Sequence, residues 1–168
     1  MLENNPVLDA IRSRRSIRKY TGEPIAEPVR RAILEAGFYA PSAMNRRPFH
    51  FVSITDRELM QKLSDLHPYA KMLPQADWAI IVCGDESVSG PFYMDDCAAA
   101  TQNILLAAHS LGVGAVWCGV DHTELRSISV GDHYLPAVLD KVGDGFRCLC
   151  DGGLLLRKVC SESIMSKC

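Results

Sequence analysis

The sequence predicts one mixed helix-and-sheet domain of the α/β or α+β class, covering residues 1–168. Segments with apolar residues at helical spacing are interspersed with short segments rich in β-branched and aromatic residues. No internal repeat is visible, and 168 residues suffice for one domain with a sizeable core. The content of 48% hydrophobic and 23% charged residues is that of an ordinary globular chain.

Two helices are predicted first along the chain. The first starts within residues 4–15, where Asn5 suits the capping position and Pro6 suits the first helical position. The second covers residues 27–40, with Pro28 in its first turn and apolar residues at helical spacing behind it.

Two strands are predicted next, with a helix between them. Residues 49–54 alternate and are mostly β-branched or aromatic, and residues 78–84 form an apolar segment typical of a central strand. Thr55 and Glu58 have the spacing of a capping box, which predicts a helix directly after the first strand.

The longest predicted helix covers residues 93–111 and ends at Gly112. Its residues are small or apolar on nearly all sides, which is typical of a buried helix. In a chain of this size, its full burial is expected to need a second subunit. A further strand is predicted over residues 114–120 and a short helix over residues 122–128.

Composition and motifs argue against several classes of protein. The formal net charge is -2, whereas general nucleic-acid binders are usually basic. No apolar stretch approaches the roughly 18 residues of a membrane span. The N-terminus lacks the features of a signal peptide, so a cytoplasmic protein is expected. The glycine-rich motifs of Rossmann and P-loop nucleotide sites are missing from the sequence.

The seven cysteines do not form a recognisable framework. Cys83 and Cys97 lie among apolar or small residues, as buried thiols do. The four C-terminal cysteines lack the spacing of a standard zinc site, and an odd total argues against a disulfide framework. No metal site is predicted, and the five histidines are interpreted as structural or exposed.

A cationic cluster, "RRSIRKY", lies at the end of the first predicted helix. Arginine makes bidentate, charge-assisted hydrogen bonds to phosphate, and Ser16 adds a hydroxyl donor. Helical spacing would place Arg14 and Arg18 on one face, pointing into one pocket. The alternative is a solvated cluster that complements the helix dipole. Nucleic-acid binding is disfavoured by the acidic balance and the lack of interleaved aromatic residues.

The loop between the second helix and the first strand contains Pro41 and Pro48, which stiffen it. Its small residues would let the backbone approach a flat ligand closely, and Asn45 can both donate and accept a hydrogen bond. An ordinary turn is the alternative interpretation.

Three segments together resemble the FMN-dependent nitroreductase family. They are "AIRSRRSIRKY", "EAGFYAPSAMNRRPFHFV" and "AAATQNILLAAHSLGVGAVWCG", and the resemblance covers about residues 7–136. It implies an α+β fold in which helices surround a mostly antiparallel central sheet, with the long helix buried in the core of a homodimer. It also implies tightly bound FMN, NAD(P)H as co-substrate, and ping-pong reduction of nitroaromatics, quinones or similar small electron acceptors.

The resemblance assigns cofactor-binding roles to residues of four segments. The cluster around the FMN phosphate, ribityl chain and pyrimidine edge corresponds to Arg14, Arg15, Ser16 and Arg18. The loop that the partner subunit lays along the flavin corresponds to Pro41, Ser42, Ala43, Met44 and Asn45, and Arg47 stands where many members have glutamine. The segment that lines the flavin ring corresponds to Trp117, Cys118 and Gly119, and a basic residue that approaches the flavin corresponds to Lys71.

The resemblance implies no catalytic acid or base from the protein, because the chemistry takes place on the flavin. Arg18 or Lys71 is expected to stabilise the negative charge of the reduced flavin. Two alternative functions remain: a flavin-binding module without turnover, and a specialised relative of the reductive dehalogenase type. The short span of residues 66–77 leaves little room for the lid that the dehalogenase type carries.

Residues 137–168 depart from the family's pattern and form an atypical tail with four cysteines. A reading-frame shift near residue 137 and a divergent tail are both compatible with this sequence.

Overall fold

The computed structural model describes residues 5–119. The helices and strands in that range are α1 (Pro6–Ser13), α2 (Glu27–Phe38), β1 (Phe49–Ile54), α3 (Arg57–Leu66), β2 (Ala79–Gly84), α4 (Glu86–Ser89) and α5 (Tyr93–Ser110). Short 3₁₀ helices cover Ala43–Asn45, Leu73–Gln75 and Gly90–Phe92. The helix predicted over residues 122–128 and the atypical tail lie outside the described residues, so the single domain over 1–168 remains a prediction.

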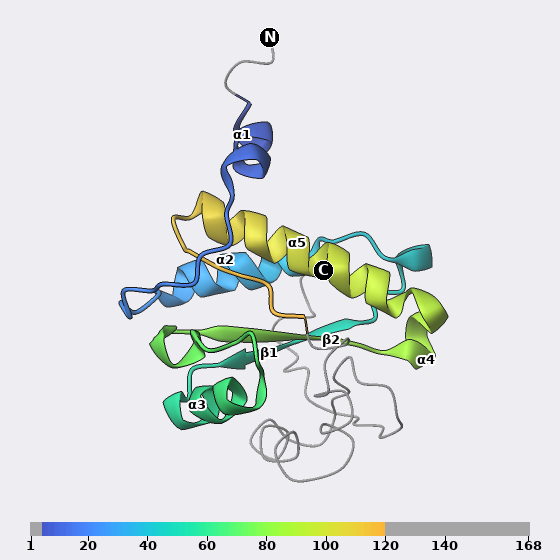
Figure 1. The fold of residues 1–168 in the computed structure, drawn as a ribbon. Coiled ribbons are helices and arrows are strands. Elements are labelled where there is room, and N and C mark those ends of the chain that lie inside the picture. The colour runs from blue at the N-terminus through green and yellow to red at the C-terminus, as the bar shows by residue number, and fades with distance from the viewer. Residues whose placement is uncertain (1–4, 120–168) are drawn as a thin grey trace.

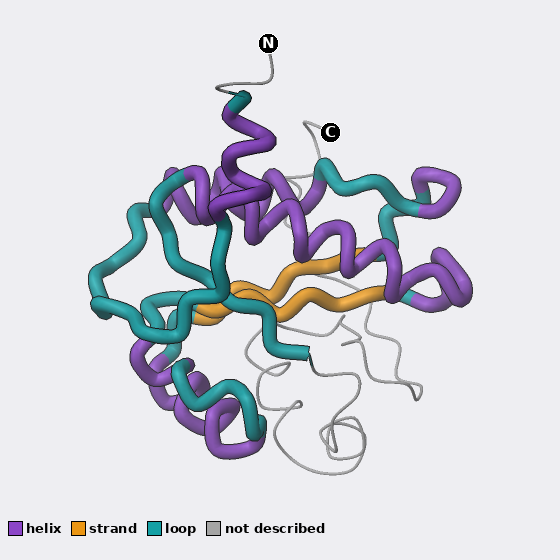
Figure 2. The backbone as a smooth tube through the Cα atoms, turned by 45° about the horizontal axis from the view of Figure 1, so that its top comes forward, coloured by secondary structure: helices purple, strands orange, loops and turns teal. Residues whose placement is uncertain are grey.

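Strands β1 and β2 pair antiparallel, in a register that runs from Phe49 opposite Gly84 to Ile54 opposite Ala79 (Figure 1). Side chains alternate between the two faces of a sheet, so each strand contributes to apolar clusters on both sides. Helices lie above and below the strands, and Figure 2 shows the resulting layers of helix, sheet and helix.

Helices α2 and α5 cover one face of the sheet. Ile33 of α2 and Ile104 and Ala108 of α5 form the buried centre of this layer, and Phe51 of β1 packs against them. Gly37 allows the close approach, because an added Cβ would lie only 2.8 Å from Cζ of Phe51. Both strands and helices predicted for this layer are therefore confirmed.

Helix α3 covers the opposite face of the sheet, where Met60 is fully buried against Val52. The helix begins differently from the predicted capping box. Asp56 is the capping residue, and its carboxylate accepts a hydrogen bond of 2.9 Å from the backbone N–H of Leu59. Aspartate and threonine are both good capping residues, so local sequence could not separate Asp56 from its neighbour Thr55.

Helix α5 agrees with the prediction of a long helix that stops before Gly112. Gly112 adopts a φ of 76°, a left-handed conformation that glycine allows at low cost. Among residues 5–119, no helix combines the length and the apolar character that crossing a membrane requires.

The prediction that Arg14 and Arg18 share a helix face is wrong. Arg14 already caps the C-terminal end of α1, and no helix follows it before α2. The chain is instead extended, since Ser16 forms a parallel bridge with Ala115 and the backbone N–H of Ile17 donates to Ala115 O at 3.0 Å. A contact across about a hundred residues thus overrides the local helical pattern.

The strand predicted over residues 114–120 is wrong for the part that the structure describes. Residues 114–119 form only the single bridge at Ala115. An extended apolar segment becomes a strand where a neighbour offers a row of backbone donors and acceptors. In the described part of the chain, the segment after α1 offers one such contact.

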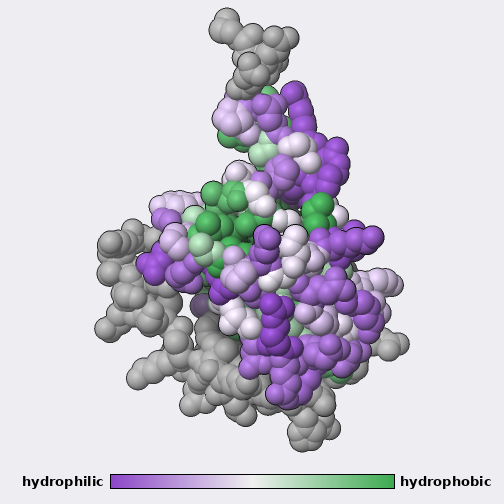
Figure 3. Space-filling view, turned by 90° about the vertical axis from the view of Figure 1, so that its left-hand side faces the viewer, coloured by the Kyte–Doolittle hydropathy of each residue, from purple (hydrophilic) through white to green (hydrophobic). Residues whose placement is uncertain are grey.

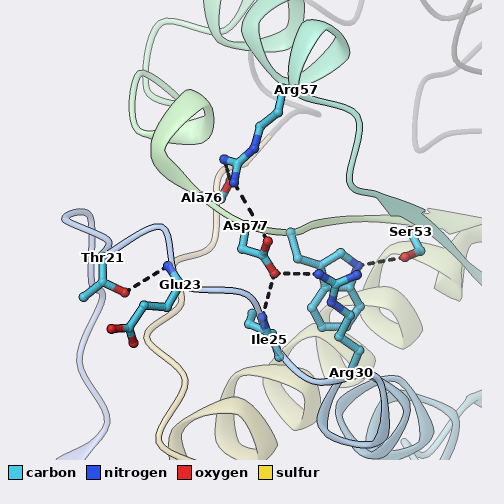
Figure 4. A network of polar contacts seen from close by, with 9 residues as sticks. Thr21, Glu23, Ile25, Arg30, Ser53, Arg57, Ala76 and Asp77 are labelled. Atoms are coloured by element: carbon cyan, nitrogen blue, oxygen red, sulfur yellow. Dashed lines mark hydrogen bonds and ion pairs between the residues drawn. The ribbon is translucent and has the colours of Figure 1, made fainter.

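The far end of the segment between α1 and α2 is held by Asp77, which precedes β2 (Figure 4). One carboxylate oxygen accepts hydrogen bonds from the backbone N–H of Ile25 at 2.8 Å and from Arg30 at 2.6 Å. The guanidinium of Arg57 lies 3.9 Å from the other oxygen. The Arg30 guanidinium also lies over the ring of Trp78, 5.8 Å from its centroid. This network joins the N-terminal segment to α2, α3 and the sheet.

Candidate functional site

A cleft of about 960 Å³ opens where three segments distant in sequence meet. The predicted site residues at this cleft are Arg18, Lys71, Trp117, Cys118 and Gly119. Each comes from a segment without regular structure, positioned by the helices and strands around it. The fold thus brings these residues together although the first and the last of them, Arg18 and Gly119, lie far apart in the sequence.

Arg18 lines the cleft with a guanidinium that can bind an anion. No hydrogen bond or ion pair joins its guanidinium to another residue of the described range. Lys19 adds a second cation, and the neighbouring Trp117 ring is 49% exposed. A cationic fork beside an exposed aromatic ring suits a ligand that is both anionic and planar.

Cys118 forms part of the cleft wall. Burial raises the pKa of its thiol, although the charge of Arg18 acts in the opposite direction. The thiol donates a weak hydrogen bond to Tyr69 O, at 3.7 Å. The group is therefore a protonated thiol near neutral pH, which agrees with the interpretation of Cys118 as pocket wall.

Lys71 is already engaged by helix α3. Its ammonium group donates to Ser64 O at 2.8 Å and approaches Asp65 O at 3.5 Å. Carbonyls near the C-terminal end of a helix attract cations in this way. The Lys71 side chain thus neighbours the cleft while its charge is directed at α3.

Three predicted cofactor contacts of the cationic cluster, Arg14, Arg15 and Ser16, lie outside the cleft-lining set. The Arg15 guanidinium folds back and donates to the carbonyls of Arg12 at 2.7 Å and Arg14 at 2.9 Å. It complements the end of α1 in the manner of the solvated alternative. Ser16 is in the bridge to Ala115, and the Arg14 guanidinium has no hydrogen-bond partner in the described range.

The second predicted region, the loop after α2, has an unusual backbone. Met44, Asn45 and Arg47 have φ values of 52°, 55° and 50°. Left-handed conformations are common for asparagine but costly for the other two residues. The Ser42 hydroxyl supports the loop by accepting from the backbone N–H of Arg47 at 2.8 Å. Strained backbone of this kind is frequent at ligand sites.

Asp96 of α5 anchors this loop. Its carboxylate is 5% exposed and accepts from the backbone N–H of Ala43 at 2.8 Å and from the Ser89 hydroxyl at 2.6 Å. Its place in the first turn of α5 adds favourable interaction with the helix dipole.

The loop is held at the start of α5, where its Ala43 N–H contacts Asp96. Within the described part of the chain, no residue of the loop is among those that line the cleft. The described residues of one chain therefore do not combine the two predicted regions into one lining.

Replacing Asp96 with alanine is expected to lower the free energy of unfolding by about 1–3 kcal/mol, because the buried Ser89 hydroxyl and the partly buried Ala43 N–H lose their acceptor. Urea unfolding followed by circular dichroism measures this. Asp95→Ala is the matched control, since Asp95 lies in the same turn but is exposed. Equal effects of the two substitutions would contradict the anchoring role of Asp96.

The nitroreductase family model matches this chain over residues 11–70 and 66–125. A Methanothermobacter thermautotrophicus protein, provisionally named NADH dehydrogenase/NAD(P)H nitroreductase, is 46% identical over 138 residues, which are 77% of this chain and 72% of the relative. A Bacteroides thetaiotaomicron protein with the same provisional name has a crystal structure that is 41% identical, with a TM-score of 0.72. That match covers 80% of this chain and 77% of the other.

A provisionally named nitroreductase from Desulfovibrio desulfuricans has been crystallised in complex with FMN. It is 37% identical to this chain, with a TM-score of 0.68, over 83% of this chain and 77% of its own. The fold is that of the solved nitroreductases, which confirms the α+β class predicted from the sequence. The chain belongs to the nitroreductase family.

Two residues with clear structural connections to these regions were missed by the sequence analysis. The sequence pattern places Asp96 within a helix and indicates only a structural or exposed role for His67. Both act through partners more than fifty residues away, so no local spacing indicates them. Among residues 5–119, no group of three or more potential ligands is arranged to hold a metal ion.

Proposed function

We propose that the protein is an oxidoreductase that binds FMN, takes electrons from NADH or NADPH, and reduces nitroaromatics, quinones or similar small acceptors. Family membership supports the oxidoreductase class. The names of relatives support the NAD(P)H reductant, and the Desulfovibrio complex supports FMN. The observation that carries the proposal is the cleft where Arg18, Trp117 and Gly119 meet.

The residues of the cleft fit FMN, which combines a planar ring with an anionic tail. Arg18 offers a guanidinium that no residue of the range 5–119 pairs with, and Trp117 offers an exposed ring. Gly119 leaves space for a ligand on its Cβ side, because an added Cβ there would meet no described residue within 4 Å. When bound, FMN supplies the two-electron chemistry between nicotinamide and acceptor.

We assign the predicted contacts as follows. Arg14, Ser16 and Arg18 hold the phosphate, ribityl chain and pyrimidine edge, while Trp117, Cys118 and Gly119 line the ring. Arg15 joins the first group once its guanidinium leaves the carbonyls of Arg12 and Arg14. Arg18 is a better candidate than Lys71 for stabilising negative charge on the cofactor, because the Lys71 ammonium is directed at Ser64 O. No side chain is assigned the role of a general acid or base.

A homodimer completes the site in this proposal. The loop residues then contact the cofactor of the partner subunit, although none of them lines the cleft within the described part of their own chain. These residues are Pro41, Ser42, Ala43, Met44, Asn45 and Arg47. Helix α1 buries none of its side chains, and Val7 and Ile11 are 64% and 51% exposed. Figure 3 shows an apolar patch directly beneath α1 on the same face. Large exposed apolar areas mark association surfaces.

The kinetic mechanism we propose is ping-pong, because reductant and acceptor would use the same cleft in turn. A specialised reductive relative of the dehalogenase type is the second candidate. Residues 66–77 carry only the end of α3 and one short 3₁₀ helix, which disfavours a lid over the cleft. A flavin-binding module without turnover is the third candidate.

The absorbance spectrum of the purified protein tests the cofactor. Bands in the near-UV and blue are expected, and mass spectrometry of the released chromophore should identify FMN. Steady-state oxidation of NADH and NADPH with a quinone or nitroaromatic acceptor tests turnover, and parallel double-reciprocal lines indicate the ping-pong mechanism. A colourless protein that gives no heat on titration with FMN would overturn the proposal. FMN binding without NAD(P)H oxidation would favour the module without turnover.

A further inference from the structure

We infer that His67 is a positioning residue that sets the spacing between two walls of the cleft and thereby the affinity for FMN. This inference rests on the proposed function. His67 is 6% exposed and follows the last residue of α3, between the helix and the cleft. It does not belong to the predicted set of cofactor contacts.

Both ring nitrogens of His67 have a partner. The backbone N–H of Tyr69 donates to Nδ1 at 3.1 Å, so Nδ1 carries no proton. The proton therefore resides on Nε2, which lies 3.0 Å from Gly119 O and donates to it. The two contacts fix one neutral tautomer and one ring orientation.

The two contacts of His67 belong to different walls of the cleft. Tyr69 lies on the wall that follows α3, and Gly119 lies on the wall that follows α5. In the described part of the chain, the other hydrogen bond between these walls is the weak one from Cys118 to Tyr69 O. His67 thus supplies the stronger connection between the segments that would flank the cofactor.

The base of this connection is rigid. The backbone N–H of His67 donates to Leu63 O of α3 at 3.0 Å, and His67 O accepts from the backbone N–H of Ala70 at 3.2 Å. The imidazole therefore projects from a fixed point, and Gly119 is held at the distance that the ring sets. A pocket held at the spacing of its ligand loses less free energy on binding than one that must first adjust.

Two amide substitutions separate the two contacts. His67→Gln places an amide nitrogen near the position of Nε2 and keeps the donor to Gly119 O. His67→Asn places an amide oxygen near the position of Nδ1 and keeps the acceptor for Tyr69, but it is too short to reach Gly119. We expect His67→Asn to raise the Kd for FMN about tenfold and His67→Gln to change it less than about threefold.

The Kd is measured by quenching of FMN fluorescence on the full chain, at a temperature where circular dichroism shows all variants folded. His50→Asn is the control, because His50 is exposed and does not line the cleft. A role confined to folding would affect both His67 variants alike. Equal FMN affinities of the two variants, whether unchanged or equally weakened, would therefore overturn the inference.

Nitrogen-15 NMR of the wild-type imidazole provides a test that does not depend on the folding of variants. The inference requires a protonated Nε2 and an unprotonated Nδ1 on His67, and the opposite tautomer would overturn it. A wild-type protein that binds no FMN would contradict the proposed function instead. Tight FMN binding by the wild type and by His67→Asn would contradict only the role of His67.

Discussion

Replacing Arg18 with alanine is expected to raise the Kd for FMN by about 10- to 100-fold, because each hydrogen bond to a charged group contributes about 1.5–3 kcal/mol. The substitution should leave the fold intact, since the Arg18 guanidinium makes no hydrogen bond or ion pair with another described residue. A double replacement of Arg14 and Arg18 should lose the cofactor during purification.

Fluorescence titration with FMN measures the effect of Arg18→Ala. Arg12→Ala is the matched control, because Arg12 lies in the last turn of α1 and does not line the cleft. A double variant of Arg14 and Arg18 that stays yellow after purification would contradict the assignment of the cationic cluster to the phosphate.

Replacing Asp77 with asparagine is expected to lower the free energy of unfolding by about 1–3 kcal/mol at neutral pH. The Asp77 and Arg30 side chains are 14% and 20% exposed, so their ion pair is shielded from water. Arg30 Nε is already buried without a hydrogen-bond partner among the described residues, and loss of the carboxylate would leave the guanidinium still less satisfied.

The same pair makes stability depend on pH. The hydrogen bond from the Ile25 N–H lowers the pKa of Asp77, and Arg30 adds to this lowering, whereas burial acts against it. A carboxyl whose pKa is lower in the folded state stabilises the fold above its unfolded pKa of about 3.9. This contribution is lost as the pH falls through the folded-state pKa.

Urea unfolding at pH 7, 5, 4 and 3 compares the wild type with Asp77→Asn. The difference in unfolding free energy should be largest at pH 7 and should shrink below about pH 4. Asp95→Asn, at an exposed position, is expected to track the wild type. A difference that stays constant down to pH 3 would show that the ionised carboxylate contributes nothing at this position.

The local sequence predicted those parts of the fold that depend on local signals. As expected, Asn5 caps the start of α1 and Gly112 follows the end of α5. The two apolar segments pair as the strands of the sheet, also as expected. The predictions failed where distant contacts decide the backbone. The bridge between Ser16 and Ala115 keeps the arginine segment extended, although its composition suits a helix.

The sequence likewise predicted only part of the candidate site. Family motifs indicated Arg18, Trp117 and Gly119, which do meet at one cleft. The motifs could not show that Arg15 folds back onto α1, because this depends on where the helix ends. They also could not indicate His67, whose partner is 52 residues away in the sequence.

The segment that carries Arg18 is tethered at both ends, by Ala115 on one side and by Asp77 through Ile25 on the other. A tethered segment has already given up much of its backbone entropy when the protein folds. Binding of an anion at Arg18 therefore costs little further backbone entropy. The favourable free energy of the contact is then not offset by ordering of the chain, so the ligand dissociates slowly. For a redox cofactor, this means slow dissociation between turnovers.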